Sequence, residues 1–134
     1  MKEKERWAFI LDRDEFVRLS LNKILKKYGF HVEEIEDFSQ LEKRKRDMED
    51  GMILADVDIE VLERWFPLLK RWTDRFMLIS PLVTDELRTR LKNIGIRRII
   101  KKPVEPRLLR RVIREIFPLD EVRTSSSGKP RTFS

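Results

Sequence analysis

The most constraining stretch of the sequence is a short apolar run, residues 52–55, that leads directly into Asp56. The run is too short for a helix, and it predicts a buried strand with Asp56 at its carboxyl end. In open α/β sheets, ligands and chemistry occupy the crevice outside the carboxyl ends of the strands. The polar side chains that end the other strands are therefore the first candidates for a functional site.

Three further strand-length runs end at a polar side chain: residues 7–11 at Asp12, 76–79 at Ser80 and 98–101 at Lys102. Parallel strands bring their carboxyl ends to one edge of a sheet. Together with Asp56, these residues are expected to bring two carboxylates, a hydroxyl and an ammonium to one rim.

Segments with helical spacing of apolar residues alternate with the strands. Asp14, Ser39 and either Thr84 or Asp85 are expected to cap three of the helices, and Pro67 is expected to kink or restart another. A second, shorter strand is predicted within residues 30–37, near a sheet edge. The helices are expected in five segments: 15–28, 39–49, 61–72, 85–94 and 105–117. Five strands alternating with five helices predict an α/β fold with a parallel sheet and helices on both faces.

The chain has 134 residues, enough for one domain with a real core, which we place at residues 1–117. Residues 118–134 lack apolar periodicity and are expected to be a disordered tail. The absence of cysteine suits a reducing compartment, and the charged start of the chain resembles neither a signal peptide nor a membrane span. We expect a soluble cytoplasmic protein with no membrane partner.

The formal net charge of +6 is concentrated in one segment. Residues 81–117 carry 11 basic and 4 acidic side chains. This excess favours an acidic protein partner for the 81–117 face, although a solvated helix surface also explains it. No helix-turn-helix, zinc-finger or aromatic-interleaved motif accompanies the arginines, so nucleic acid is not the expected partner.

The order of Asp12, Asp56, Ser80 and Lys102-Pro103 resembles the receiver domain of two-component response regulators. The resemblance covers residues 6–117, with 44 residues from Asp12 to Asp56 and 22 from Ser80 to Lys102. It implies a CheY-like, flavodoxin-like fold: a single three-layer sandwich whose five-stranded parallel sheet has the order 2-1-3-4-5. It also implies a signalling switch rather than an enzyme, and we expect no output domain in this chain.

The resemblance further implies that Asp56 accepts a phosphoryl group from a histidine kinase or phosphotransfer protein. A carboxylate approaching a phosphoryl dianion needs a divalent cation to offset the charge. Mg²⁺ is therefore expected at Asp12, Asp56 and Asp58, the last through its carbonyl oxygen. Lys102 is expected to hold a phosphoryl oxygen, and the Ser80 hydroxyl to be drawn toward another.

Several residues depart from the receiver pattern. Arg13 replaces a second acidic residue after the first strand, so its guanidinium is expected to compete with Mg²⁺ and weaken its binding. Pro81 and Ile99 replace a small residue and an aromatic ring, which predicts blunted switching. The stretch from Asp56 to Ser80 is about six residues shorter than in the family the resemblance names, so the third helix is expected to be truncated.

These departures keep a second interpretation open, a pseudo-receiver that binds partners without phosphorylation. A more remote alternative is a phosphatase of the haloacid dehalogenase type, because Asp12-Arg13-Asp14 resembles its nucleophile motif. Those enzymes need an acidic pair after the lysine, and only Glu105 and Glu115 occur between Lys102 and Asp120. The other remote alternative is nucleic-acid binding through the basic segment.

Overall fold

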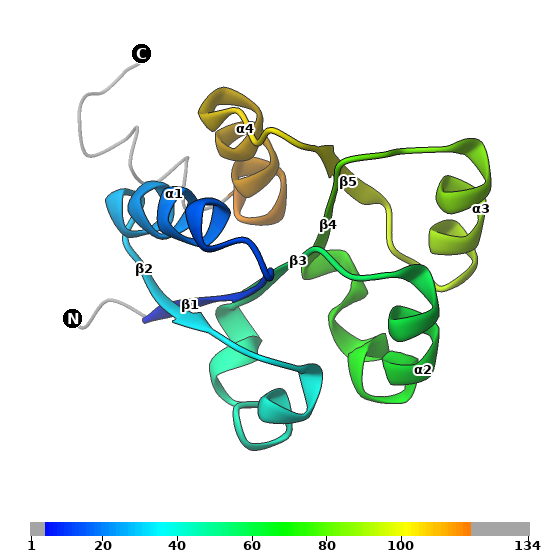
Figure 1. Ribbon diagram of the computed structural model, residues 1–134. Helices are drawn as coiled ribbons and strands as arrows, with labels where there is room; N and C mark the ends of the chain where they lie inside the picture. The colour runs from blue at the N-terminus through cyan, green and yellow to red at the C-terminus, as the bar shows by residue number, and fades with distance from the viewer. Residues whose placement is uncertain (1–4, 119–134) are drawn as a thin grey trace, which may run out of the picture. The chain divides into compact units, whose positions relative to one another are not determined.

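The computed structural model describes residues 5–118, and the chain forms two compact units, Met1–Pro103 and Val104–Ser134. The first unit contains a five-stranded sheet, drawn in Figure 1. Its strands are β1 (Arg6–Leu11), β2 (Phe30–Glu34), β3 (Met52–Ala55), β4 (Phe76–Ser80) and β5 (Arg98–Lys101). All neighbouring strands are parallel and the order is β2-β1-β3-β4-β5. The predicted fold class and strand order are confirmed.

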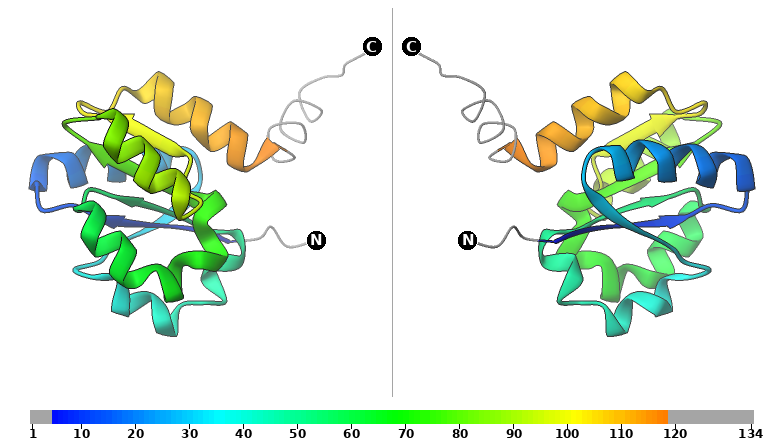
Figure 2. Two further views of the ribbon diagram at one scale, coloured as in Figure 1. Left: turned by 90° about the vertical axis from the view of Figure 1, so that its right-hand side faces the viewer. Right: turned by 90° about the vertical axis from the view of Figure 1, so that its left-hand side faces the viewer.

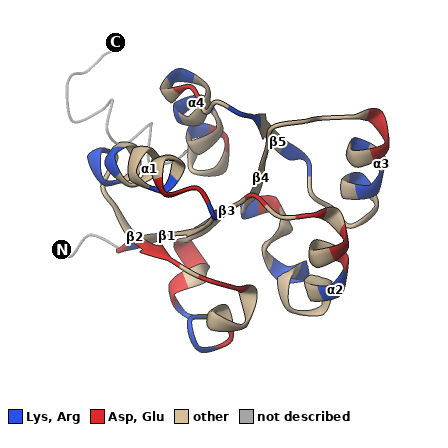
Figure 3. Ribbon diagram, viewed as in Figure 1, with Lys and Arg blue, Asp and Glu red and all other residues tan. Residues whose placement is uncertain are grey.

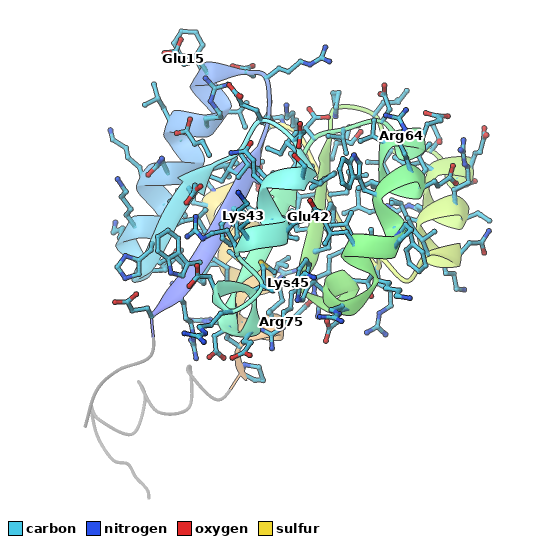
Figure 4. The ribbon with its side chains drawn as sticks, turned by 90° about the horizontal axis from the view of Figure 1, so that it is seen from below. Glu15, Glu42, Lys43, Lys45, Arg64 and Arg75 are labelled. Carbon is cyan, nitrogen blue, oxygen red and sulfur yellow. The ribbon has the colours of Figure 1, made fainter. Side chains whose placement is uncertain are left out.

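Helices and 3-10 turns cover both faces of this sheet. The α-helices of the first unit are α1 (Glu15–Lys27), α2 (Ile59–Leu69) and α3 (Asp85–Asn93), and the 3-10 turns are η1 (Phe38–Lys43), η2 (Asp47–Asp50) and η3 (Lys70–Arg75). Helix α1 lies on one side of the sheet, and η1, η2 and α2 lie on the other (Figures 1 and 2). The view from below shows η1, which carries Glu42 and Lys43, beside α2, which carries Arg64 (Figure 4).

The alternation of side chains along the strands separates two apolar layers. Phe9, Ile53 and Leu78 face the layer that α2, α3 and the 3-10 turns complete with Phe38, Leu41, Leu62, Trp72 and Leu91. Their strand neighbours, such as Ile10 and Leu54, are also fully buried and point to the opposite face. Helix α1 contributes its buried leucines to that face. A sheet covered on both faces explains why the strands are almost entirely apolar.

The predicted limits of α1 are confirmed. The Asp14 side chain accepts the backbone N–H of Phe16 at 2.9 Å and that of Val17 at 3.4 Å, which satisfies two of the free donors of the first turn. After the helix, Gly29 adopts a φ of 89°, a left-handed conformation that glycine tolerates best. The chain then enters β2, which is an edge strand as expected.

The α-helix predicted for residues 39–49 with Ser39 as its cap is wrong. The structure has the two 3-10 turns η1 and η2 there, and Asp37 is the cap, accepting the Ser39 N–H at 2.7 Å. The buried residues Phe38 and Leu41 are three positions apart, the repeat of a 3-10 helix. Arg44 then ends η1 and bonds to Glu33 and Asp47, so the chain turns where an α-helix would continue.

Helix α2 begins at Ile59, immediately after Asp58, and is 11 residues long, which agrees with the predicted truncation. Pro67 was expected to kink or restart this helix; it does not restart it, because α2 continues through Pro67 to Leu69, and a kink at Pro67 stays a prediction. The α-helix ends there and the chain continues as the 3-10 turn η3, with a non-helical conformation at Trp72. Thr84 caps α3 by accepting the Leu87 N–H at 3.1 Å.

The described part of the second unit consists mainly of α4 (Pro106–Ile116). Pro106 occupies the first turn, where its missing N–H costs nothing. None of the helices described is long and apolar enough to span a membrane. A single domain over residues 1–117 stays a prediction, and the tail predicted for residues 118–134 lies outside the described residues except for Pro118.

Candidate functional site

Three of the polar residues predicted at the strand ends meet at one point. The Lys102 Nζ atom lies 2.9 Å from Asp12 Oδ2 and 2.5 Å from Asp56 Oδ2. These residues follow β5, β1 and β3, so the parallel topology alone brings them to the same rim. Figure 3 shows acidic residues where the chain leaves β1 and β3. We call Asp12, Asp56 and Lys102 the rim triad.

Lys102 is held in its charged form by the two carboxylates. Partial burial acts to lower the pKa of Lys102, but the hydrogen bonds and negative charges of Asp56 and Asp12 outweigh this effect, and the pKa is raised above its ordinary value. The Asp56 side chain is 27% exposed, against 3% for Asp12. Asp56 is therefore the carboxylate of the triad that is more accessible from solvent.

Asp12 is almost completely buried, with a side chain that is 3% exposed. Its Oδ1 atom accepts the backbone N–H of Asp14 at 2.8 Å. Its Oδ2 atom pairs with the Lys102 ammonium at 2.9 Å. Asp12 is therefore a buried carboxylate whose two oxygens are held by a backbone N–H and by the Lys102 ammonium.

Arg13 does not contact the triad. Its side chain is exposed, and within the described part of the chain neither Asp12 nor Asp56 pairs with it. Asp14 is also unavailable as a replacement ligand, because its carboxylate caps α1. The cation that holds the two carboxylates is Lys102, and competition between Arg13 and Mg²⁺ stays a prediction.

Ser80 ends β4 at the same rim, but its hydroxyl points into its own loop. The Ser80 Oγ atom donates to the Leu82 carbonyl at 2.7 Å and accepts the Leu82 N–H at 3.3 Å. Only the backbone of Ser80 reaches Lys102, by accepting its N–H at 2.9 Å. The hydroxyl must therefore rotate away from Leu82 before it can meet a group bound at Asp56.

The ligand set predicted for Mg²⁺ is only partly assembled. Within residues 5–118, no three His, Cys, Asp or Glu side chains are grouped to hold a metal. The Asp58 carbonyl accepts the N–H groups of Val61 at 3.0 Å and Leu62 at 3.3 Å, because α2 starts directly after this residue. Asp12 and Asp56 do fit Mg²⁺, which often binds through two carboxylates and keeps several water ligands. The two carboxylates already share one cation, the Lys102 ammonium, and this supports the fit.

The triad opens into a cavity of about 820 Å³ in the first unit. The walls come from the chain after β1, the chain after β2, and the start of α2. The cavity is lined by Leu11, Asp12, Arg13, Asp14, Arg18, Glu34, Ile35, Glu36, Asp37, Phe38, Asp56, Val57, Asp58, Val61, Trp65 and Lys102. Strands β1 and β3 are neighbours in the sheet, but the helix after β1 (α1) and the helix after β3 (α2) lie on opposite faces. Parallel sheets of this kind leave a crevice at the point where the connections separate.

Two arginines form long-range contacts that were not predicted from the sequence, and one of them, Arg18, lines the cavity. Arg18 donates to the Asp12 carbonyl at 2.8 Å and pairs with Glu34 at 2.9 Å, which fixes the loop after β1 against the end of β2. Arg90 of α3 pairs with Glu63 at 2.6 Å and Glu60 at 3.3 Å, which ties α3 to α2. No local pattern predicts the ion pairs, because the glutamate partners of the two arginines are 16 to 30 residues away in the sequence.

Comparison with solved structures identifies the fold. A response regulator from Thermotoga maritima superposes with a TM-score of 0.65 at 20% identity, covering 86% of this chain and 99% of that one. The chemotaxis response regulator CheY4 of Vibrio cholerae gives 0.67 at 15% identity, covering 85% and 100%. CheY in a CheX-CheY-BeF₃-Mg²⁺ complex from Borrelia burgdorferi gives 0.66 at 18% identity, covering 83% and 88%.

No protein-family model matches the sequence, and neither does any curated protein. The similarity to response regulators is therefore a similarity of structure at low sequence identity. It shows that the chain has the fold of CheY-like signal receiver domains.

Proposed function

We propose that the chain is a signalling receiver that is switched by phosphorylation of Asp56. The observation that carries the proposal is the rim triad, in which Asp56 is the more exposed carboxylate and lies 2.5 Å from the Lys102 ammonium. The receiver fold of the solved structures supports the same assignment. The phosphoryl donor is a histidine kinase or a phosphotransfer protein.

In the reaction, an oxygen of Asp56 forms a bond to phosphorus as the bond between phosphorus and the donor breaks, and the donor keeps the electron pair. Lys102 is placed to neutralise a phosphoryl oxygen, since its Nζ atom already contacts Asp56. Asp12 and Asp56 are the residues that would hold Mg²⁺, which offsets the negative charge of the phosphoryl group when bound. Arg18 keeps the loop of Asp12 in position.

Phosphorylation adds about 1.5–2 negative charges beside Lys102 and Asp12. The added charge gives the Ser80 hydroxyl a new acceptor in place of the Leu82 carbonyl. The loop after β4 is then free to reposition, which is how the modification would reach a partner. Pro81 stiffens this loop, so we expect a small displacement.

The partner surface is assigned to the arginine row of α4, defined as Arg107, Arg110, Arg111 and Arg114. All four side chains are exposed, and they line a hollow of about 470 Å³ with Glu115. Another arginine of the basic segment 81–117, Arg90 of α3, pairs with Glu60 and Glu63 of α2. The arginine row lies on one short helix, so its four positive charges are close together. An acidic protein surface is the partner that such a row fits.

The experiment that tests phosphorylation uses Mg²⁺ and beryllofluoride with the purified protein. We expect amide NMR shifts at the ends of β1, β3 and β4, and no shifts for Asp56→Asn. Asp58→Asn is the matched control, because only the carbonyl of Asp58 was expected to act. An unchanged spectrum for the wild-type protein at millimolar Mg²⁺ would contradict the proposal.

A second candidate function is a partner-binding module that needs no phosphorylation. Two contacts favour it: the Asp58 carbonyl is committed to α2, and the Ser80 hydroxyl is committed to Leu82. A receiver of the proposed kind would use the Asp58 carbonyl to bind Mg²⁺ and the Ser80 hydroxyl to contact the phosphoryl group. Here both groups are bonded to other parts of the chain. In this case, Asp56→Asn would bind its partner as tightly as the wild type, and beryllofluoride would leave the affinity unchanged.

A further inference from the structure

Three different groups hold the three oxygens of Asp12. The Arg18 Nη1 atom donates to the Asp12 carbonyl oxygen at 2.8 Å, and the Asp14 backbone N–H donates to Oδ1, also at 2.8 Å. The Lys102 ammonium pairs with Oδ2 at 2.9 Å. Two of the three contacts therefore come from α1 and its cap, and the third comes from the residue after β5.

These contacts are affected differently by the proposed reaction. Phosphoryl transfer to Asp56 draws the Lys102 ammonium toward a phosphoryl oxygen, which weakens its contact with Asp12. No hydrogen bond or ion pair joins Arg18 to Asp56 or Lys102 in the described part of the chain. The contacts from α1 are therefore the ones that can keep Asp12 in place while the charge at Asp56 changes.

Arg18 reaches the Asp12 carbonyl because of its place on α1. It lies one turn into the helix, where its backbone N–H donates to the Asp14 carbonyl at 3.0 Å. Helical side chains lean toward the helix N-terminus, so the guanidinium is directed back to the segment between β1 and α1. There it lines the cavity beside the rim triad.

Glu34, at the end of β2, fixes the orientation of the Arg18 guanidinium. Its Oε1 atom accepts the Arg18 Nε–H at 2.9 Å, and its Oε2 atom accepts an amide N–H of Asn22 at 3.0 Å. Arg18 and Asn22 are four residues apart, so they stand on one face of α1. With Nε bonded to Glu34, the planar guanidinium aims Nη1 at Asp12. We call the contacts that join Asn22, Glu34, Arg18 and Asp12 the α1 clamp.

The exposure of the α1 clamp is more consistent with a role at the site than with a role in stability. The Arg18 and Glu34 side chains are 27% and 41% exposed, and ion pairs as open to solvent as this add little to the free energy of unfolding. Arg90 and Glu63 form a comparable pair between α3 and α2, with side chains 31% and 39% exposed. Arg90 does not line the cavity, so it is a matched control for Arg18.

We propose that Arg18 is a positioning residue of the rim, which keeps the Asp12 carboxylate aligned with Asp56 when Lys102 turns to a phosphoryl group. Arg18 acts through the Asp12 carbonyl and not by binding the phosphoryl group or the metal. Its consequence rests on the proposed function, because the alignment affects a reaction only if Mg²⁺ and a phosphoryl group bind at the rim. The alignment itself is a property of the free protein.

The Asp14 amide proton reports the position of the Asp12 carboxylate, because this N–H donates to Oδ1. Amide NMR of the full chain without metal should show the Asp14 resonance at higher field in Arg18→Met than in the wild type, as the hydrogen bond lengthens. Arg90→Met should leave the resonance unchanged. An Asp14 resonance that stays in place in Arg18→Met, or that moves equally in both variants, would overturn the proposal.

Mg²⁺ titrations followed by the same amide signals measure the consequence for the site. Removal of a group that orients a metal ligand commonly weakens metal binding by about 10- to 100-fold, so we expect a loss of at least about tenfold in Arg18→Met and none in Arg90→Met. Arg18→Lys should recover only part of the affinity, because an ammonium lacks the fork that serves Glu34 and the Asp12 carbonyl together. Equal Mg²⁺ affinities for Arg18→Met and a wild type that binds Mg²⁺ would contradict the positioning role.

Two variants of Glu34 test the α1 clamp without changing Arg18. Glu34→Gln keeps an acceptor for the Arg18 Nε–H and should resemble the wild type in both measurements. Glu34→Ala removes the acceptor and should reproduce part of the effect of Arg18→Met. The clamp is refuted if Glu34→Ala leaves the Asp14 resonance where it is in the wild type.

The same measurements separate this proposal from the phosphorylation of Asp56. A wild-type protein that responds to neither Mg²⁺ nor beryllofluoride contradicts phosphorylation, while an Asp14 resonance displaced only in the clamp variants still supports the positioning role. Conversely, beryllofluoride that binds Arg18→Met as tightly as the wild type supports phosphorylation and overturns the role of Arg18.

Discussion

Lys102 is the residue on which the rim depends, because one ammonium serves two carboxylates from different strands. Asp12 is buried and Asp56 lies beside it, so removal of the ammonium leaves two like charges facing each other. The same geometry gives a phosphoryl group a cation as soon as it reaches Asp56. A single side chain thus links the stability of the rim to its proposed chemistry.

Lys102→Met should destabilise the fold by about 1–3 kcal/mol at neutral pH, because it leaves a buried carboxylate without its partner. The folded-state pKa of Lys102 is raised above its ordinary value of 10.5, so its contribution to stability is fully present below pH 10.5. The contribution is lost as the pH rises through the folded-state pKa.

Urea unfolding of the wild type and of Lys102→Met across this range checks the prediction. The difference in unfolding free energy should be constant between about pH 7 and 9 and should shrink above pH 10.5. Lys101→Met is the matched control, since the Lys101 side chain is exposed at the end of β5. A difference that grows with pH would show that Lys102 is not held in its charged form by the carboxylates.

At the scale of secondary structure, helix starts decide which polar groups remain available to the site. The Asp14 carboxylate accepts backbone N–H groups of the first turn of α1, and the Asp58 carbonyl accepts backbone N–H groups of the first turn of α2. Both groups are therefore used by the helices that follow the triad strands. The helix that follows β3 thus engages one expected ligand, the Asp58 carbonyl, and the helix that follows β1 engages the nearby Asp14 carboxylate.

Asp14→Ala should cost about 1 kcal/mol of stability, because the first turn of α1 loses its cap. Asp14→Ser should keep most of that stability, since a hydroxyl also caps. Mg²⁺ titrations followed by amide NMR should give the same affinity for Asp14→Ser and the wild type. A large loss of Mg²⁺ affinity in Asp14→Ser would show that the carboxylate leaves the cap to bind the metal.

Gly51 joins η2 to β3, where the chain passes close to other backbone. A Cβ atom at this position would lie 2.8 Å from the Asp47 carbonyl oxygen and 3.0 Å from that of Trp7. Gly51→Ala should therefore destabilise the protein by about 1–3 kcal/mol, as overpacking usually does. Gly29→Asn should cost less, because nothing lies within 4 Å and asparagine tolerates positive φ. Thermal unfolding of both variants checks the order.

In the whole molecule, acidic and basic side chains are concentrated in different places, and this determines the charge of the partners that can bind at each. The cavity of the first unit is lined by more acidic than basic residues, whereas the arginine row of α4, in the second unit, is basic. A symmetric dimer through the arginine row would place like charges together. An acidic partner avoids this repulsion and should associate faster at low ionic strength.

The triple reversal of Arg107, Arg110 and Arg111 to Glu should slow association with an acidic partner several-fold at low salt, with a polyglutamate peptide as a simple stand-in. Reversal of Lys23, Lys26 and Lys27 on α1 changes the net charge equally and serves as the control. Stopped-flow association rates at two salt concentrations provide the measurement. Association that is independent of salt would show that the arginine row is only a solvated surface.

The sequence by itself predicted most element limits and the three residues of the rim triad, and its resemblance to receiver domains implied the sheet order. Four of the strands could be predicted because each leads into a polar residue, and parallel strands bring those ends together. Strand β2, with the sequence FHVEE, is of mixed composition. The caps of α1 and α3 could be predicted because Asp14 and Thr84 bond within three residues of themselves. Local chemistry was sufficient in these cases.

The tertiary structure decided everything that depends on the direction of a bond or on a distant partner. The Ser80 hydroxyl turns to Leu82, the Asp58 carbonyl is taken by α2, and the chain after β2 forms 3-10 turns around Arg44. The cavity with its apolar wall at Trp65 is also visible only once the segment after β2 and α2 are in place. Composition and spacing do not encode these features, because each depends on which groups the packed chain leaves free to bond.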